Sequence, residues 1–186
     1  MKKIAILFSG EGTNMENILK TLHKKKVKVV KTITNNPQAN GIKKAEKYNI
    51  PTVIINNKNY SSREEFDKEL VRELKKEKLD LVVLAGFMRI LTPIFTDNIK
   101  AINIHPSLLP HFKGAKAIQR SFESNLKEAG VTVHEVSSEL DSGEIILQES
   151  FKKDNMNFTE FEKRIHEIEY SLYPKAILKY LGEKYE

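Results

Sequence analysis

Cysteine is absent from this sequence, and its absence removes several kinds of chemistry at once. The chain can form no disulfide, offers no thiolate to a metal ion and carries no cysteine nucleophile. Long apolar runs are also missing, because no stretch approaches the roughly 20 residues that a membrane helix needs. The basic and apolar start stops at Ser9-Gly10, too early for a signal-peptide core, and is more typical of a first buried strand. We therefore predict a cytoplasmic protein with no membrane partner.

Arginine is scarce, although the formal net charge is +6. The 31 basic residues comprise 26 lysines and 5 arginines, and arginine is the residue that proteins favour for reading bases and gripping phosphates in pairs. Many lysines alternate with acids, as in residues 72–78, a pattern typical of a solvated helix face. We therefore expect no nucleic-acid partner. A weak positive field that attracts small anionic substrates remains compatible with this charge.

Apolar segments alternate with amphipathic ones along the whole chain. A length of 186 residues suits one domain with a full core and is too short for two ordinary domains, so we predict a single domain over 1–186. The expected strands are residues 3–8, 27–33, 52–55, 79–86, 101–104, 131–136 and 144–151. The expected helices are residues 14–23, 42–48, 61–76, 93–99 and 117–125, and a long last helix with its apolar side running from Phe158 to Ile177.

This alternation predicts an α/β fold, a Rossmann-like open sheet that is mostly parallel and has helices on both faces. The last two strands are joined too tightly for a crossover helix, so we expect an antiparallel pair near the C-terminal end. In open sheets of this kind, ligands bind beyond the carboxyl ends of the strands. The loops that follow the strands are therefore where functional residues should lie.

A glycine-rich loop, residues 9–14, joins the first strand to the first helix. Glycine allows close approach to a ligand, and the free amides at a helix start point at an anion. Gly10 and Gly12 match two glycines of a dinucleotide fingerprint, but Met15 stands at the third position and no acid ends the second strand. The loop thus disfavours NAD and suits a phosphate monoester, held by the amides of Gly12 and Thr13 and the side chain of Asn14. The alternative is a turn that only links strand to helix.

Asn103 and His105 carry the sharpest chemical signal. They are two residues apart at a strand end, so both side chains lie on one face of the sheet. Histidine can move a proton near neutral pH, and an amide beside it can donate to a developing oxyanion. The alternative for His105 is a loop histidine bonded only to backbone.

Asp141 lies in the turn between the last two expected strands, which could return it to the place occupied by His105. A carboxylate there could orient the imidazole, hold a water molecule or take up a proton; a solvated turn aspartate is the alternative. The five histidines show no metal-ligand spacing, so we expect no metal. The sequence also lacks the Gly-x-Ser-x-Gly pattern of a serine nucleophile.

Four segments in this order, residues 8–14, 84–91, 103–110 and 140–143, resemble the motifs of the folate-dependent formyltransferases. The resemblance covers residues 3–181. It implies transfer of the formyl group of 10-formyltetrahydrofolate to the glycinamide amine of 5-phosphoribosylglycinamide, giving formylglycinamide ribonucleotide and tetrahydrofolate in purine synthesis. The amine would attack the formyl carbon, and donors from the protein would stabilise the negative oxygen of the tetrahedral centre.

The resemblance also implies roles for individual residues. The catalytic residues would be Asn103, His105 (as imidazolium) and Asp141. The phosphoribosyl substrate would contact Gly12, Thr13, Asn14 and Glu169. The folate would contact Arg63, Met88, Arg89, Ile90, Leu91 and Asn103. No metal takes part.

Residues 113–120 depart from the pattern common in bacterial enzymes that formylate glycinamide ribonucleotide, and are similar to the tRNA-formylating branch instead. Roles for Lys116 and Ile118 cannot be carried over. Three alternatives stay open: a 10-formyltetrahydrofolate hydrolase, a methionyl-tRNA formyltransferase-like enzyme, and a folate or nucleotide sensor without activity. The sequence leaves open whether the protein is a monomer or a homodimer.

Overall fold

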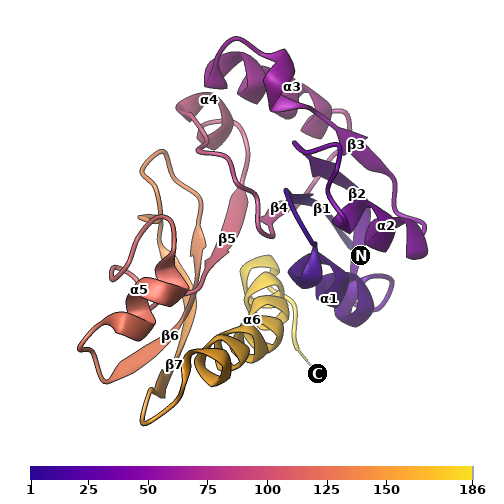
Figure 1. Cartoon of the computed structure of the whole chain (residues 1–186). Helices are drawn as coiled ribbons and strands as arrows, with labels where there is room; N and C mark the ends of the chain where they lie inside the picture. The colour runs from indigo at the N-terminus through magenta and orange to yellow at the C-terminus, as the bar shows by residue number, and fades with distance from the viewer. Residues whose placement is uncertain (186) are drawn as a thin grey trace.

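The computed structural model describes residues 1–185 and shows a seven-stranded sheet in the order β3-β2-β1-β4-β5-β6-β7 (Figure 1). The strands are β1 (Lys2–Phe8), β2 (Val27–Thr34), β3 (Thr52–Ile54), β4 (Leu81–Leu84), β5 (Ala101–His105), β6 (Glu128–Glu135) and β7 (Ile145–Lys152). The helices are α1 (Thr13–Leu22), α2 (Gly41–Lys47), α3 (Arg63–Leu74), α4 (Pro93–Thr96), α5 (Ala117–Glu123) and α6 (Phe158–Leu181), with a 3₁₀ turn at Asn57–Asn59.

The sheet has a parallel part and an antiparallel part. Strands β1 to β5 pair in parallel, while β6 is antiparallel to both β5 and β7. The predicted α/β open sheet with an antiparallel pair near the C-terminal end is therefore confirmed. The antiparallel part is larger than predicted, because β6 also runs opposite to β5 and its pairing with β7 starts at Glu128.

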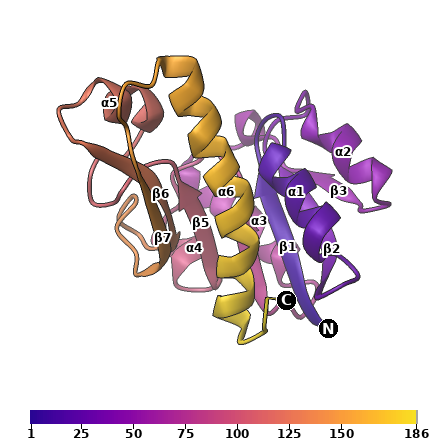
Figure 2. The same ribbon diagram turned by 90° about the horizontal axis from the view of Figure 1, so that it is seen from below.

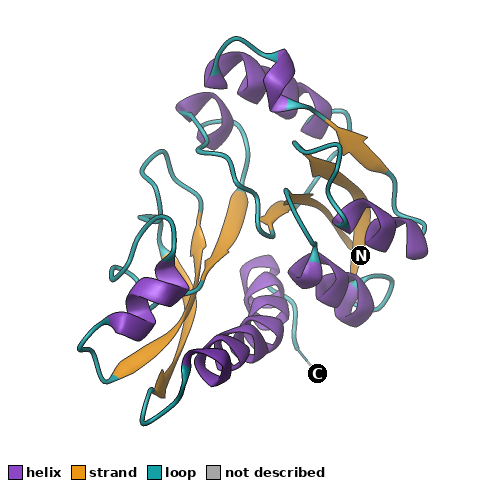
Figure 3. Ribbon diagram, viewed as in Figure 1, coloured by secondary structure: helices purple, strands orange, loops and turns teal. Residues whose placement is uncertain are grey.

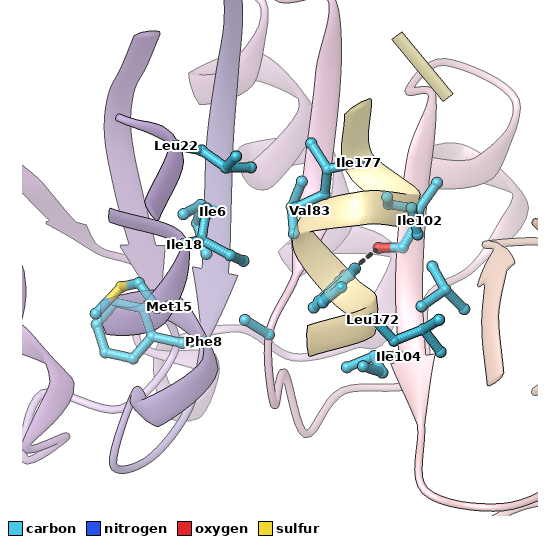
Figure 4. Close-up of a cluster of buried hydrophobic side chains, with 14 of the residues drawn as sticks. Ile6, Phe8, Met15, Ile18, Leu22, Val83, Ile102, Ile104, Leu172 and Ile177 are labelled. Carbon is cyan, nitrogen blue, oxygen red and sulfur yellow. Dashed lines mark hydrogen bonds between the residues drawn. The ribbon is translucent and has the colours of Figure 1, made fainter. Parts of the chain in front are cut away.

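Helices cover both faces of the sheet (Figures 2 and 3). Ile4, Ile6 and Phe8 point to the face covered by α1 and α6, and Ala5 and Leu7, which alternate with them, point to the face covered by α3 and α4. Figure 4 shows side chains of α1 and α6 meeting those of β1, β4 and β5 in the first of these cores. The buried apolar residues of the helices thus form two separate layers, one on each face of the sheet.

Helix α6 is anchored to the sheet by a buried polar contact as well as by apolar packing. The hydroxyl of Tyr173, which is fully buried, donates to the carbonyl oxygens of Leu84 (2.5 Å) and Ile102 (3.2 Å). Burial raises the pKa of Tyr173 well above 10.0, so the hydroxyl stays a donor. One side chain of α6 therefore spans the neighbouring strands β4 and β5.

Two expectations about helices differ from the structure. The helix expected over 93–99 ends at Thr96, because the amides of Asn98 and Ile99 both donate to the carbonyl of Phe95 and close a turn before β5. Phe158 was expected on the apolar side of the last helix, but it remains 39% exposed and packs edge-on against Phe122. It is the first residue of α6, and its ring contact is with α5.

Candidate active site

Polar side chains occupy one face of β5 and β6. Asn103 pairs with His134 across the two strands, and His105 pairs with Thr132. The residues between them, such as Ile102 and Ile104, face the α6 core. Because side chains alternate along a strand, the four polar residues share the opposite face, where loops rather than a helix cover them.

The ring of His105 is held at both nitrogens. Its Nε2 lies 2.8 Å from the carbonyl oxygen of Phe112, and since a carbonyl only accepts, this nitrogen carries a proton. Its Nδ1 lies 3.5 Å from Oδ2 of Asp141. His105 is 6% exposed and Asp141 is 8% exposed. The structure therefore brings these two predicted residues together and turns Nδ1 of His105 toward the carboxylate.

Asp141 is placed by the segment in which the sequence departs from the expected pattern. The backbone amide of Gly114 donates to Oδ2 of Asp141 at 2.8 Å, and Lys113 Nζ donates to the hydroxyl of the next residue, Ser142, at 2.7 Å. Asp141 itself has a left-handed backbone, with φ of 52°. Since His105 is bonded to Phe112, residues 112–114 contact both members of the His105–Asp141 pair.

His134 is part of this cluster and was not predicted. Its Nδ1 donates to the carbonyl of Glu135 at 2.8 Å, and its Nε2 lies 3.7 Å from Oδ1 of Asp141. Burial lowers the pKa of His134, partly opposed by the Glu135 carbonyl and the Asp141 carboxylate. A signal was available in the sequence, because Thr132 and His134 alternate with valines in the same way as Asn103 and His105 alternate with isoleucines.

The loop that follows His105 is fixed by Thr132. The Thr132 hydroxyl donates to the carbonyl of Ser107 (2.7 Å) and accepts from the amide of Leu109 (3.1 Å) and from Nε2 of Gln148 (2.8 Å). The three bonds use all the hydrogen-bonding capacity of this hydroxyl. Strands β6 and β7 thereby hold the end of β5 and the turn after it in one position.

A first cavity opens beside Asn103. Its lining comprises Leu84, Phe87, Arg89, Ile90, Leu91, Asn103, His134 and residues 136–141. It thus includes four of the residues predicted to contact folate. Of the other two, Arg63 is exposed in the first turn of α3 and Met88, 78% exposed, turns away from this cavity. Neither lines the pocket beside Asn103.

A second hollow, of about 260 Å³, lies along the glycine-rich loop. It is lined by residues 9–14 together with Ala85, Gly86 and Met88. Both hollows therefore border the segment that follows β4, with Met88 on one side and Arg89 on the other. The hydroxyl of Ser9 accepts from the amide of Met88 at 2.8 Å, which ties the two loops together.

Glycine is required at position 12 by both backbone and space. Gly12 caps α1 with φ of 69°, and an added Cβ would lie 2.9 Å from the Cα of Gly41. No side chain caps the start of α1, so its first amides have no side-chain acceptor. The binding of a phosphate at this loop stays a prediction.

Glu169, on the last helix, contacts one residue that lines this hollow. Asn14 Nδ2 donates to Oε2 of Glu169 at 2.8 Å, and His166 Nδ1 donates to Oε1 at 2.9 Å. Glu169 is 7% exposed. The structure therefore places Glu169 beside Asn14, although the two residues lie far apart in the sequence.

Within residues 1–185, no group of three or more histidine, aspartate or glutamate side chains is arranged to hold a metal ion. No helix in the same range is long and apolar enough to cross a membrane.

Known proteins are similar over nearly the whole chain. The family described as "Formyl transferase" matches residues 2–177. A phosphoribosylglycinamide formyltransferase of Haemophilus influenzae is 41% identical over 95% of this chain and 86% of its own length, and that of Bacillus subtilis is 36% identical over 98% and 96%. The crystal structure of phosphoribosylglycinamide formyltransferase from Campylobacter jejuni superposes with a TM-score of 0.95 at 52% identity, covering 97% of both chains.

Proposed function

Because the chain belongs to the formyl transferase family, we propose that it transfers the formyl group of 10-formyltetrahydrofolate to the amine of 5-phosphoribosylglycinamide. The products are formylglycinamide ribonucleotide and tetrahydrofolate. The observation that carries the proposal is the geometry of the His105–Asp141 pair, because Asp141 and Asn103 line the first cavity. The second hollow, along the glycine-rich loop and called the phosphate-type hollow below, borders the same segment after β4. Relatives that cover nearly the whole chain bear the name of this activity.

The two hollows suit the two substrates. The amides of Gly12 and Thr13 and the side chain of Asn14 bind the phosphate, and Glu169 accepts a hydrogen bond from the sugar. The folate lies in the cavity bordered by Arg89, Ile90 and Leu91, which Asn103 also lines. The family resemblance also assigns Met88 and Arg63 to the folate, although neither lines this cavity. The formyl group then lies between the two substrates, near His105.

Formyl transfer needs an oxyanion stabiliser and a route for one proton. The amine attacks the formyl carbon on N10 of the folate, and the carbonyl oxygen becomes negative. The Asn103 amide and protonated Nδ1 of His105 donate to that oxygen. Asp141, 3.5 Å from Nδ1, helps move the amine proton to the departing nitrogen of the folate. The C–N10 bond then breaks and tetrahydrofolate leaves.

The direct test is folate turnover. The protein is mixed with 10-formyltetrahydrofolate, with and without glycinamide ribonucleotide, and deformylation is followed by absorbance. Release that depends on the ribonucleotide supports the proposal. Release without it indicates a hydrolase. If the protein is folded but releases no formyl group, charged initiator tRNA is the next acceptor to test. Inactivity with tRNA as well would favour a folate or nucleotide sensor without activity.

A further inference from the structure

Glu169 has two hydrogen-bonding neighbours of different character. On one side it accepts from Asn14, whose backbone lies in the first turn of α1 and lines the phosphate-type hollow. On the other side it accepts from His166 on its own helix. A phosphate in that hollow would therefore lie one side chain away from a buried carboxylate, and like charges repel most where water is partly excluded.

His166 is the group that can offset this repulsion. Its ring is 2.9 Å from Glu169, is 44% exposed and stacks on Tyr170. The hydrogen bond to Glu169 raises the pKa of His166 above 6.5, although partial burial opposes the positive charge. The imidazolium leaves the Glu169–imidazole pair without net charge, whereas the neutral ring leaves a full negative charge beside Asn14.

Resting on the function proposed above, we infer that His166 is a positioning residue for the phosphoribosyl substrate. The positive charge of His166 holds the Glu169 carboxylate in place and offsets its negative charge, which would otherwise repel the substrate phosphate. The affinity for the ribonucleotide therefore falls as His166 loses its proton. His166 touches no reacting atom in this scheme. Loss of the His166 charge should therefore raise the KM for the ribonucleotide and leave kcat unchanged.

The charges around His166 support its assignment as the titrating group. Two carboxylates act on it, Glu169 and Glu162, both from α6. The facing side of α1 contributes neutral amides, because Asn14 bonds Glu169 and Asn17 bonds the carbonyl of Tyr170. The ionisable residues of the elements that pack against α6 are Glu16 and Lys20 (α1), Arg120 and Glu123 (α5), His105 (β5), Glu128, His134 and Glu135 (β6), and Glu149 and Lys152 (β7). Within residues 1–185, none of them is hydrogen-bonded or ion-paired to His166.

The direction of the pH effect follows from this arrangement. Below its pKa His166 is charged and the ribonucleotide binds well, and as pH rises through that pKa the KM increases. Because the pKa lies above 6.5, the increase falls on the alkaline side of that value. The substrate titrates as well, its phosphate with a second pKa near 6 and its α-amine near 8. This titration is the same for every protein tested, so the KM of each variant is compared with that of a control at the same pH.

The experiment compares KM for glycinamide ribonucleotide from pH 6.5 to 9 at saturating folate in three proteins. In the natural chain we expect KM to rise about threefold to fivefold, the size of a partly exposed ion pair. His166→Lys keeps its charge, so its KM should stay low and much flatter with pH. His166→Gln keeps a donor to Glu169 without charge, so its KM should exceed that of the control most at pH 6.5 and approach it at pH 9. Lys163→Gln, which removes an exposed charge from the same helix, serves as the control and should follow the natural chain.

The inference is overturned if His166→Gln follows the natural chain at every pH, or if His166→Lys shows the same alkaline rise. A measurement on the natural chain alone also tests the coupling between His166 and the ribonucleotide. In the natural chain, the NMR titration midpoint of His166 should move upward when glycinamide ribonucleotide saturates the site. An unmoved midpoint would contradict the coupling.

The two levels of the hypothesis fail in different ways. If the natural chain shows no ribonucleotide-dependent formyl release and no ribonucleotide binding, the proposed function fails and the inference fails with it. If the natural chain is active but its KM and the variants do not behave as described, only the role of His166 is wrong.

Discussion

The two faces of β5 and β6 carry opposite kinds of side chain. On one face, Ile102, Ile104 and Val133 pack in the core beneath α6. On the other, Asn103, His105 and His134 lie beneath loops, next to a cavity. A face covered by a helix is apolar because apolar side chains are the ones that gain stability from burial there. A face covered by loops can hold polar groups and still admit a substrate. The same two strands therefore serve stability with alternate residues and chemistry with the rest.

The sharpest way to test this division is to remove oxyanion donors from the polar face. Asn103→Ala and His105→Ala should each lower kcat by about 10²–10³, the usual loss for one such donor. The free energy of unfolding in urea should change much less than for a core truncation, because neither residue belongs to the apolar core. Nearly unchanged turnover in both variants would contradict the assignment.

A truncation on the face covered by α6 should lower stability and leave turnover unchanged. Ile177→Ala removes a fully buried side chain of α6, which should lower the free energy of unfolding by about 2–5 kcal/mol. In conditions where the variant remains folded, kcat should be close to that of the natural chain. Lys175→Ala, on the exposed side of the same helix, is the control and should have little effect on either quantity. A loss of turnover in folded Ile177→Ala would break the division between faces.

A smaller loss of stability is expected from Tyr173→Phe. The change removes only the hydroxyl that bonds Leu84 and Ile102, which should cost about 1–3 kcal/mol because buried carbonyls lose a donor. Urea unfolding measures this, with the exposed Tyr185→Phe as the matched control. If the two phenylalanine variants are equally stable, the bond from α6 to the strands contributes nothing.

The smallest effect concerns pH. Burial lowers the pKa of His134 in the folded protein below 6.5, so the unfolded chain binds a proton first as pH falls. The stability that depends on neutral His134 is complete above pH 6.5 and is lost below it. His134→Asn keeps a donor for the Glu135 carbonyl and cannot titrate, so its stability should decline less steeply between pH 6.5 and 5. Parallel pH profiles of unfolding would show that His134 contributes nothing to acid sensitivity.

Much of the fold could be predicted because its signals are local. The spacing of Met15, Ile18, Leu19 and Leu22 is that of one helix face, and all four are buried. Boundaries were predicted less well where a tertiary contact decides them. The start of β6 at Glu128 depends on its partner Lys152, and the end of α4 depends on two amides that share the Phe95 carbonyl.

The site could be predicted only in part, because tertiary contacts place some of its residues. The i, i+2 spacing of Asn103 and His105 fixes their common face, but nothing local places Asp141. Its position depends on a left-handed backbone and on the amide of Gly114, 27 residues away. His134 could have been found from the polar alternation in β6. The roles of Met88 and Arg63 stay predictions, since neither lines the cavity beside Asn103.

The hydrogen bond between Asn14 and Glu169 joins residues 155 positions apart. During synthesis, the loop for the phosphate leaves the ribosome well before its partner carboxylate, which is made 155 residues later. A nascent or truncated chain that ends before α6 therefore holds only half of this site. The ribonucleotide should accordingly protect only molecules in which α6 has docked, because it links two segments that are far apart in the sequence.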